Sequence, residues 1–197
     1  AFQGQLASLA GARLHETIPN FHHTPSRFAT LEQAIQADAK NRAAGCRAEI
    51  DFCLRQKAWV GRLIEAQQRG EIPERVTHND TKLNNVMIDE ATGEGICVID
   101  LDTVMPGLAL YDFGDMVRTS TSPAKEDEQD LSKVTMRMSY FEALARGYLA
   151  TAGSFLTPAE KSQLAFSGKL ITFEIGVRFL TDHLQGDVYF KIHRSDH

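Results

Sequence analysis

The sequence has no surplus of basic residues and no long apolar run, and each absence excludes a class of protein. Its 21 lysines and arginines are outnumbered by 26 aspartates and glutamates, so the net charge is −5 and we expect no nucleic-acid partner. No apolar stretch approaches the roughly 20 residues of a transmembrane helix. The opening residues AFQGQLASLAG lack the basic and apolar regions of a secretory signal, so we expect a cytoplasmic protein without a membrane partner.

Cysteine is scarce as well. Cys46, Cys53 and Cys97 form no C-x-x-C pair. Cys46 and Cys53 are seven residues apart, which on a helix is a rise of about 10 Å, too far for a disulfide. We therefore expect three free thiols in a reducing compartment.

The sequence also lacks a glycine-rich loop for binding phosphates. Neither G-x-G-x-x-G nor G-x-x-x-x-G-K-[ST] occurs, and TGEG at 92–95 is short enough to be a simple turn. There is no initiator methionine, and the sequence stops in the polar run HRSDH. We interpret the chain as a fragment of a longer protein.

What the sequence does contain is a regular helical pattern over most of its length. With 43% hydrophobic residues, the chain has enough apolar side chains for a sizeable core. Two prolines and no apolar period predict a loop over 15–29. Apolar spacing of three and four predicts helices over the following ranges: 2–9, 30–43, 47–69, 134–148 and 158–184. The last of these has the clearest start, with Thr157 as N-cap, Pro158 at the first position and Glu160 completing a capping box.

The middle of the sequence has a different pattern. The short apolar stretches NVMID and ICVID flank the glycine-containing segment EATGEG, which predicts a β-hairpin of two buried strands. We therefore expect an α+β chain that is mainly α-helical, with one small central hairpin.

Polar residues gather at the open end of this hairpin. His78, Asp80, Lys82 and Asn85 precede or begin the first strand, and Asp100 follows the second. Because a tight hairpin places the start of one strand beside the end of the other, we expect Asp80, Asn85 and Asp100 to converge. Two carboxylates and an amide oxygen suit Mg²⁺, which takes water and phosphate oxygens as its other ligands.

The spacing of these residues is more informative than their composition. HNDTKLNN fits H-x-D-x-K-x-x-N, the catalytic-loop pattern of protein-kinase-like phosphotransferases. In that template Asp80 orients the attacking hydroxyl and takes its proton, while Lys82 neutralises the migrating phosphoryl group. Asn85 and Asp100 hold the metal ions that bridge the phosphates of ATP.

The block from HNDTKLNN to YDFGDMVR resembles the aminoglycoside phosphotransferase/choline kinase superfamily, and within it the N-acetylhexosamine 1-kinases most. The resemblance implies the C-terminal lobe of the protein-kinase fold, with its catalytic loop on the hairpin. It also implies an ATP-dependent sugar kinase that phosphorylates the anomeric hydroxyl of an N-acetylhexosamine and requires Mg²⁺.

The resemblance assigns roles to individual residues. It implies Asp80 as the base, Asn85 and Asp100 as Mg²⁺ ligands, and His78 as the residue that organises the loop. In the block GVRFLTDHLQGDVYFKIHR, it implies that the sugar is contacted by Arg178 and Tyr189.

The resemblance also implies a β-rich nucleotide-binding lobe, which the helical pattern before the hairpin does not supply. We expect residues 1–29 to lead from a missing N-terminal lobe, and residues 30–197 to form a C-terminal catalytic lobe truncated at its own end. The chain alone is then expected to consume no ATP when sugar is added. The sequence does not indicate an oligomeric state.

Several of these residues have plainer interpretations. Asp80 and Asn85 fit turn caps, Asp100 fits the cap of a strand end, and Lys82 fits a solvated loop charge. Asp102 fits either a loop cap or a neighbour of the metal.

The later acidic and basic residues have similar alternatives. Asp112, like Asp115 in YDFGD, fits an N-cap or a buried acid that braces the catalytic loop. Arg178 fits a helix-face ion pair with Glu174 or Asp182, and Tyr189 fits a packing residue. Solvated or hinge roles fit the histidines of the 15–29 loop, which lack metal-ligand spacing: His15, His22 and His23.

Other functions also remain open at this level. One is a kinase for a different acceptor, such as an aminoglycoside, choline or homoserine. A second is a metal-dependent phosphatase or sulfatase built on the same acids. A third is a binding module that keeps the fold without catalysis.

Overall fold

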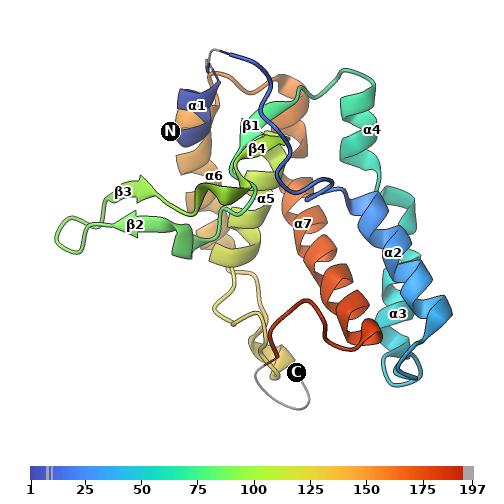
Figure 1. Cartoon of the computed structure of the whole chain (residues 1–197). Helices are drawn as coiled ribbons and strands as arrows, with labels where there is room; N and C mark the ends of the chain where they lie inside the picture. The colour runs from blue at the N-terminus through green and yellow to red at the C-terminus, as the bar shows by residue number, and fades with distance from the viewer. Residues whose placement is uncertain (8, 10, 193–197) are drawn as a thin grey trace.

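The computed structural model describes residues 1–7, 9 and 11–192. In it one short antiparallel strand pair lies among the helices and a second projects from them as a hairpin (Figure 1). The α-helices are α1 (Phe2–Leu6), α2 (Thr24–Ala37), α3 (Arg47–Arg55), α4 (Arg62–Gln68), α5 (Ala109–Ser120), α6 (Met138–Ala152) and α7 (Pro158–Gln185). The strands are β1 (Arg75–Thr77), β2 (Val86–Ile88), β3 (Gly95–Val98) and β4 (Met105–Gly107). A mixed, mainly helical fold with a small central hairpin is thus confirmed.

Helix α7 is the longest element, and α2 and α5 pack along it (Figure 1). It starts with the predicted capping box: Glu160 N–H donates to Thr157 Oγ1, and Thr157 N–H donates to the Glu160 carboxylate. Helix α5 approaches α7 closely because residue 114 is glycine. A Cβ on Gly114 would lie 2.5 Å from the carbonyl oxygen of Ser167, so any side chain there would push the two helices apart.

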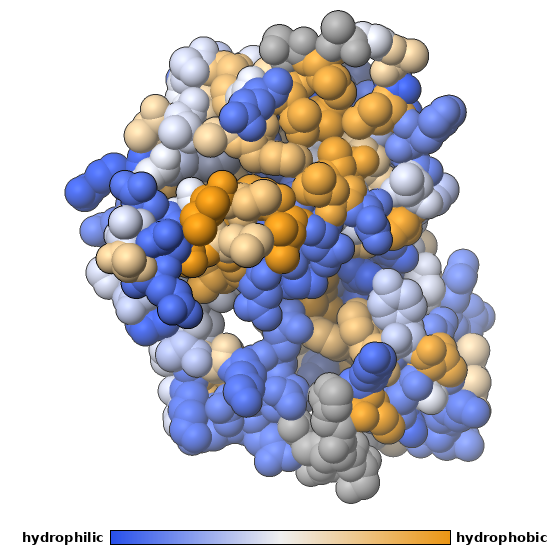
Figure 2. Space-filling model, turned by 60° about the vertical axis from the view of Figure 1, so that its left-hand side comes forward, coloured by the Kyte–Doolittle hydropathy of each residue, from blue (hydrophilic) through white to orange (hydrophobic). Residues whose placement is uncertain are grey.

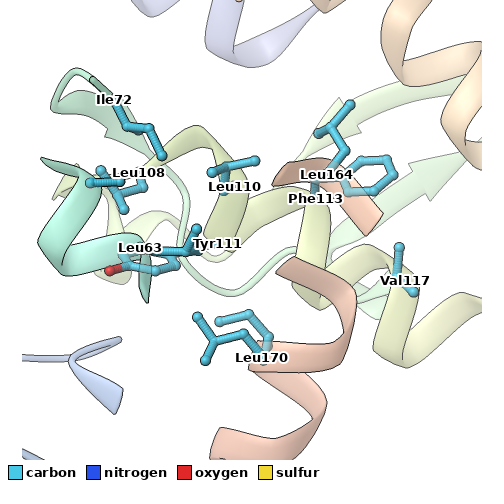
Figure 3. Packing of buried hydrophobic residues seen from close by; sticks show 11 residues of the cluster. Leu63, Ile72, Leu108, Leu110, Tyr111, Phe113, Val117, Leu164 and Leu170 are labelled. Carbon is cyan, nitrogen blue, oxygen red and sulfur yellow. The ribbon is translucent and has the colours of Figure 1, made fainter. Parts of the chain in front are cut away.

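Two apolar clusters form the core. One joins α4, α5 and α7 (Figure 3) and contains Leu63, Ile72, Leu108, Leu110, Tyr111, Phe113, Val117, Leu164, Leu170 and Ile171. The other joins α2, α3 and α7 and contains Phe28, Leu31, Ile50, Cys53, Phe173, Val177 and Leu184. The first cluster fixes α5 against α7, and α5 carries the acid that holds the candidate catalytic loop.

The two strand pairs differ in how well the sequence predicts them. The expected hairpin is β2–β3, with Val86 opposite Val98. The pair β1–β4 was not expected, because β4 is only three residues long and contains Pro106 and Gly107, which disfavour strands.

The prediction that the hairpin strands are buried is wrong. Met87, Ile88 and Ile96 are 51%, 48% and 63% exposed, and the hairpin projects from the helical body (Figure 1). Figure 2 shows exposed apolar side chains gathered on the face turned toward the viewer. A short apolar run is compatible with a strand at the surface as well as in the core, and its sequence does not distinguish them.

The helix boundaries also differ from the predictions in several places. Helix α2 begins at Thr24 and not at Thr30: the Nδ1 atom of His23 accepts the Ser26 N–H, and Pro25 sits in the first turn, where no N–H is needed. The predicted helix over 47–69 is broken into α3, a 3₁₀ turn and α4. The break lets the Trp59 ring pack on Phe173 of α7, at 4.8 Å between ring centroids.

Further along the chain, the helix predicted over 134–148 begins only at Met138. The acidic run at 125–130 precedes this helix and is followed by a short 3₁₀ turn, Leu131–Lys133. Apolar spacing alone did not locate this start, because Val134 and Met136 continue the period while remaining about half exposed.

The states of the cysteines and the properties of the helices can be compared with the sequence predictions. Cys46, Cys53 and Cys97 are free, as predicted. Within the part of the chain that the structure describes, no helix combines the length and apolarity needed to cross a bilayer.

A buried ion pair ties β1 to the start of α7. Arg75 Nε and Nη2 lie 2.7 and 2.8 Å from the two carboxylate oxygens of Glu160, a residue with 0% exposure. Burial acts to raise the pKa of Glu160, but the hydrogen bonds from Arg75 and from Thr157 N–H outweigh it and hold the pKa below its usual value.

The pair is therefore expected to stabilise the fold above the pKa of an unfolded glutamate, and this stability should be lost as pH falls through the lower folded-state pKa. Glu160→Gln should cost about 3–5 kcal/mol at pH 7, because Arg75 loses its charged partner. The cost should shrink toward pH 3. Urea unfolding across this range measures it, with Glu71→Gln in the exposed Arg69–Glu71 pair as a silent control. Parallel pH curves for wild type and Glu160→Gln would contradict the linkage.

Candidate active site

The predicted catalytic residues lie on a loop between β1 and β2, and Asp112 is its main anchor. Asp112 is 1% exposed. Its Oδ2 accepts hydrogen bonds from His78 N–H (3.1 Å) and Gln3 Nε2 (2.6 Å), and its Oδ1 accepts one from Asn79 N–H (2.7 Å). Burial raises the pKa of Asp112, while these donors act to lower it. The N-cap alternative is wrong, since Leu108 occupies that position; the bracing role fits.

His78 fixes the other side of the loop. Asp80 N–H donates to His78 Nδ1 (3.3 Å), so the ring proton belongs on Nε2, which donates to the carbonyl oxygen of Ile99 (2.9 Å). The Thr103 hydroxyl donates to the His78 carbonyl oxygen (2.7 Å). With 0% exposure, His78 is placed to orient the loop and does not reach a ligand, which fits its expected organising role.

Asp80 presents one open carboxylate oxygen. Lys82 Nζ lies 2.7 Å from Asp80 Oδ2, and Asn85 Nδ2 donates to the same oxygen (3.0 Å) and to the Asp80 carbonyl oxygen (2.8 Å). Across the described ranges, no hydrogen bond reaches Asp80 Oδ1, and the side chain is 24% exposed. A hydroxyl group of a ligand can therefore reach Oδ1 while Oδ2 stays held.

Lys82 is part of this site. Its hydrogen bond to Asp80 raises the pKa of Lys82, and the charges of Asp80, Asp100 and Asp115 act in the same direction. The interpretation of Lys82 as a merely solvated charge is therefore wrong. Its ammonium group is held over the carboxylate that the pattern identifies as the base.

The hairpin brings Asp100 to the same end of the site. The Ile99 N–H donates to the Asn85 carbonyl oxygen (2.9 Å), so Asp100 follows directly after the residue paired with Asn85. Asp100 is exposed and has a left-handed backbone, with φ of 62°, which turns the chain out of β3. The chain therefore brings Asp100 to the end of the hairpin where Asn85 lies, and their joint role as metal ligands stays a prediction.

The oxygen atoms at this end suit a cation that takes few protein ligands. Asn85 directs its amide nitrogen at Asp80, which leaves Asn85 Oδ1 and the Asp100 carboxylate available. No cluster of three or more His, Cys, Asp or Glu side chains capable of holding a metal occurs in residues 1–7, 9 and 11–192. Such a sparse set fits Mg²⁺ bound together with phosphates. Asp102 is exposed, and its backbone carbonyl oxygen accepts a hydrogen bond from the Thr17 hydroxyl (3.1 Å).

Comparison with known families agrees with this geometry. The sequence model of a family described as the phosphotransferase enzyme family matches residues 1–158, which include the whole loop and hairpin. The chain belongs to the phosphotransferase enzyme family. Membership favours transfer of a phosphoryl group to an acceptor over the phosphatase and sulfatase alternatives.

Arg178 and Tyr189 of this phosphotransferase lie beyond the matched residues but lie next to each other. Arg178 Nη2 donates to the Tyr189 hydroxyl (3.2 Å), and its guanidinium lies 5.6 Å from the centre of the Phe21 ring. The predicted helix-face ion pairs are wrong, because Glu174 binds His22 and Thr24, and Asp182 accepts the backbone N–H groups of residues 188–190.

Arg178 and Tyr189 line a pocket of about 130 Å³, which we call the Arg178 pocket. Its lining includes Arg27, Thr30, Thr181 and Phe190. No hydrogen bond or ion pair joins these residues to the Asp80 loop in the described part of the chain. Arg27 Nε is buried and has no hydrogen-bond partner there.

Sequence reasoning missed three residues that support the phosphotransferase loop. They are Gln3, His22 and Asn79, and all three are buried. His22, interpreted as solvated or a hinge residue, bonds Glu174 and the Asn79 carbonyl oxygen. A buried role for His22 has no local sequence signal, because its partners are distant in the chain.

Proposed function

We propose that the chain is the catalytic lobe of an ATP-dependent kinase that phosphorylates the anomeric hydroxyl of an N-acetylhexosamine. The observation that supports this most directly is the open Oδ1 of Asp80, on a loop within the region that matches the phosphotransferase family. On this proposal the chain is a protein-kinase-like C-terminal lobe, and a separate nucleotide-binding lobe completes the enzyme.

The proposed reaction needs positioning more than strong nucleophilic chemistry. ATP would supply the phosphoryl group, with Mg²⁺ offsetting the charge that develops on it. Asp80 Oδ1 orients the acceptor hydroxyl and receives its proton, and Lys82 keeps a positive charge beside that carboxylate. An anomeric hydroxyl is more acidic than an ordinary alcohol, so a carboxylate is a sufficient base. Asn85 Oδ1 and the Asp100 carboxylate are the protein groups placed to hold Mg²⁺.

The acceptor assignment rests on the Arg178 pocket. We propose that Arg178 and Tyr189 contact the sugar, and that Arg27 adds a donor to the same pocket. Two guanidinium groups and a phenol hydroxyl suit an acceptor rich in hydroxyl and carbonyl oxygens.

A panel of acceptors tests the proposal. ADP release from the complete protein should be stimulated by N-acetylglucosamine or N-acetylgalactosamine. It should not be stimulated by choline, homoserine or an aminoglycoside. Stimulation by an amino alcohol alone would assign a different acceptor, and phosphate release without ATP would favour a hydrolase.

The proposed metal ligands give a separate prediction. Asp100→Ala is expected to raise the KM for Mg²⁺·ATP at least about tenfold, with a smaller effect on the KM for the acceptor. Asn85→Ala should do the same and also lower kcat, because it removes the hydrogen bond to Asp80. Initial rates at varied Mg²⁺ measure both. Asp102→Ala is the matched control, since its exposed carboxylate lies two residues from Asp100; an equal loss in this control would contradict the assignment to Asp100.

A further inference from the structure

A buried histidine and a buried glutamate meet behind the catalytic loop. His22 Nδ1 lies 2.8 Å from Glu174 Oε1, and the two side chains are 4% and 0% exposed. His22 Nε2 lies 2.8 Å from the carbonyl oxygen of Asn79, the residue before Asp80. The hydroxyl of Thr24 donates to the second oxygen of Glu174 (2.5 Å).

The partners of the ring determine where its protons are. The Asn79 carbonyl oxygen can only accept, so His22 Nε2 must donate to it. The Glu174 carboxylate also only accepts, so Nδ1 must donate as well. A neutral ring would place a nitrogen lone pair against one of these two oxygens. With Glu174 as a carboxylate, both contacts are met by a doubly protonated His22, and the raised pKa of His22 favours this form.

The position of this contact matters for Asp80. The Asn79 carbonyl and the Asp80 N–H belong to one peptide group, which is planar. His22 holds the carbonyl end of this group, and His78 Nδ1 holds its N–H end. Asn79 has a left-handed backbone, with φ of 66°, a conformation that asparagine adopts more readily than most residues with a side chain. The contacts on both sides hold this peptide in its orientation.

We propose that His22 and Glu174 form a protonation-dependent clamp that positions Asp80 through the Asn79–Asp80 peptide. Neither residue touches a reacting atom, so both are positioning residues. The inference rests on the proposed role of Asp80 as the base. It adds a buried ion pair, assembled from the segment before α2 and from α7, to the machinery of the loop.

The groups around His22 determine how the clamp responds to pH. Glu174 faces it from α7, while Asp115 and the Tyr111 ring face it from α5. Burial acts to lower the pKa of His22, but the hydrogen bond and charge of Glu174, the Asn79 carbonyl and the charge of Asp115 outweigh it and raise the pKa. A histidine with a raised folded-state pKa contributes below its unfolded value and loses that contribution as pH rises through the folded value. The clamp should thus fail on the alkaline side.

Substitutions separate positioning from simple packing. In the complete enzyme, His22→Ala should lower kcat about tenfold to a hundredfold through misplacement of Asp80, with the KM values for acceptor and Mg²⁺·ATP changing less than about threefold. Glu174→Gln should retain most of kcat, because its amide can donate to Nδ1 of a neutral ring and accept from Thr24. In this variant, kcat should also no longer fall at alkaline pH through loss of the clamp. Glu174→Ala should resemble His22→Ala.

The neighbouring histidine provides a matched control. His23→Ala removes the side-chain cap of α2, so it should lower the Tm by about 2–4 °C and leave kcat unchanged. If His22→Ala keeps the wild-type kcat, or if Glu174→Gln is as impaired as Glu174→Ala, the positioning role is wrong.

A measurement without turnover tests the clamp separately from the kinase proposal. In the ¹⁵N NMR spectrum of the wild-type protein at pH 7, both ring nitrogens of His22 should carry a proton. In His22→Ala, the Asp80 amide should exchange with solvent at least about tenfold faster than in His23→Ala. A neutral His22 ring, or equal exchange in the two variants, would overturn the clamp whatever the acceptor is. Failure of the acceptor panel with these signals intact would count against the proposed function alone.

Discussion

Asp80→Asn is expected to lower the kcat of the complete enzyme by about a thousandfold, while the KM values for acceptor and Mg²⁺·ATP stay within roughly threefold of wild type. Asparagine has nearly the shape of aspartate, and its side-chain oxygen still accepts a hydrogen bond from Lys82 or Asn85. What it loses is the capacity to take a proton from the acceptor hydroxyl at Oδ1. The expected effect is therefore on the chemical step and not on binding.

Steady-state kinetics and thermal unfolding of the same preparation measure this result. The matched control is Asp89→Asn at the turn of the hairpin, where the carboxylate accepts hydrogen bonds from the backbone N–H groups of Ala91 and Thr92 and from the Thr92 hydroxyl. This control should melt slightly earlier and keep its kcat. An Asp80→Asn enzyme with kcat within tenfold of wild type would show that another group accepts the proton.

Asp112→Ala is expected to lower both stability and activity strongly. The carboxylate accepts from His78 N–H, Asn79 N–H and Gln3 Nε2 in a site that is 1% exposed. Removing it leaves three buried donors without this acceptor, at about 1–3 kcal/mol each. We expect a loss of about 4 kcal/mol in the free energy of unfolding and a Tm lower by roughly 10 °C. Activity should be lost with it, since the loop that carries Asp80 is no longer held.

A graded series keeps this prediction testable if Asp112→Ala does not fold. Gln3→Ala removes one of the three hydrogen bonds and should cost about 1 kcal/mol with most activity retained. Asp112→Asn keeps the volume but turns an amide N–H toward a donor, so its cost should fall between the two. Chemical unfolding monitored by circular dichroism measures the free energy of unfolding of each variant and so gives their order of stability. An Asp112→Asn protein as stable as wild type would show that Asp112 does not anchor the loop.

Some of the fold and site follow from short-range rules. Thr157, Pro158 and Glu160 specify the start of α7 within four positions, and the structure has this capping box. The placement of Asn85 beside Ile99, just before Asp100, was predictable because a single turn joins β2 and β3. In such cases the interacting groups are close in sequence, so the spacing of the residues along the chain is enough to predict their arrangement in space.

Other features depend on contacts that the sequence does not place. The break after α3 exists because Trp59 packs on a helix that follows much later in the chain. The same limit applies to the loop's supports. Glu174 lies 152 residues from His22, and Asp112 lies 109 residues from Gln3. No periodicity or spacing in the sequence connects the residues of such pairs. They are identified only from the positions of α5 and α7 in the structure.

The close approach of α5 to α7 at Gly114 determines which substitutions position 114 can tolerate. Asp112 lies half a turn earlier on the same helix, so the absence of a side chain at residue 114 sets how deeply that carboxylate sits beneath the loop. A larger residue there would displace the anchor without touching any ligand. In a library of random variants, position 114 would then be as intolerant as an active-site position, and the substitutions able to restore it would lie on α7, near Ser167.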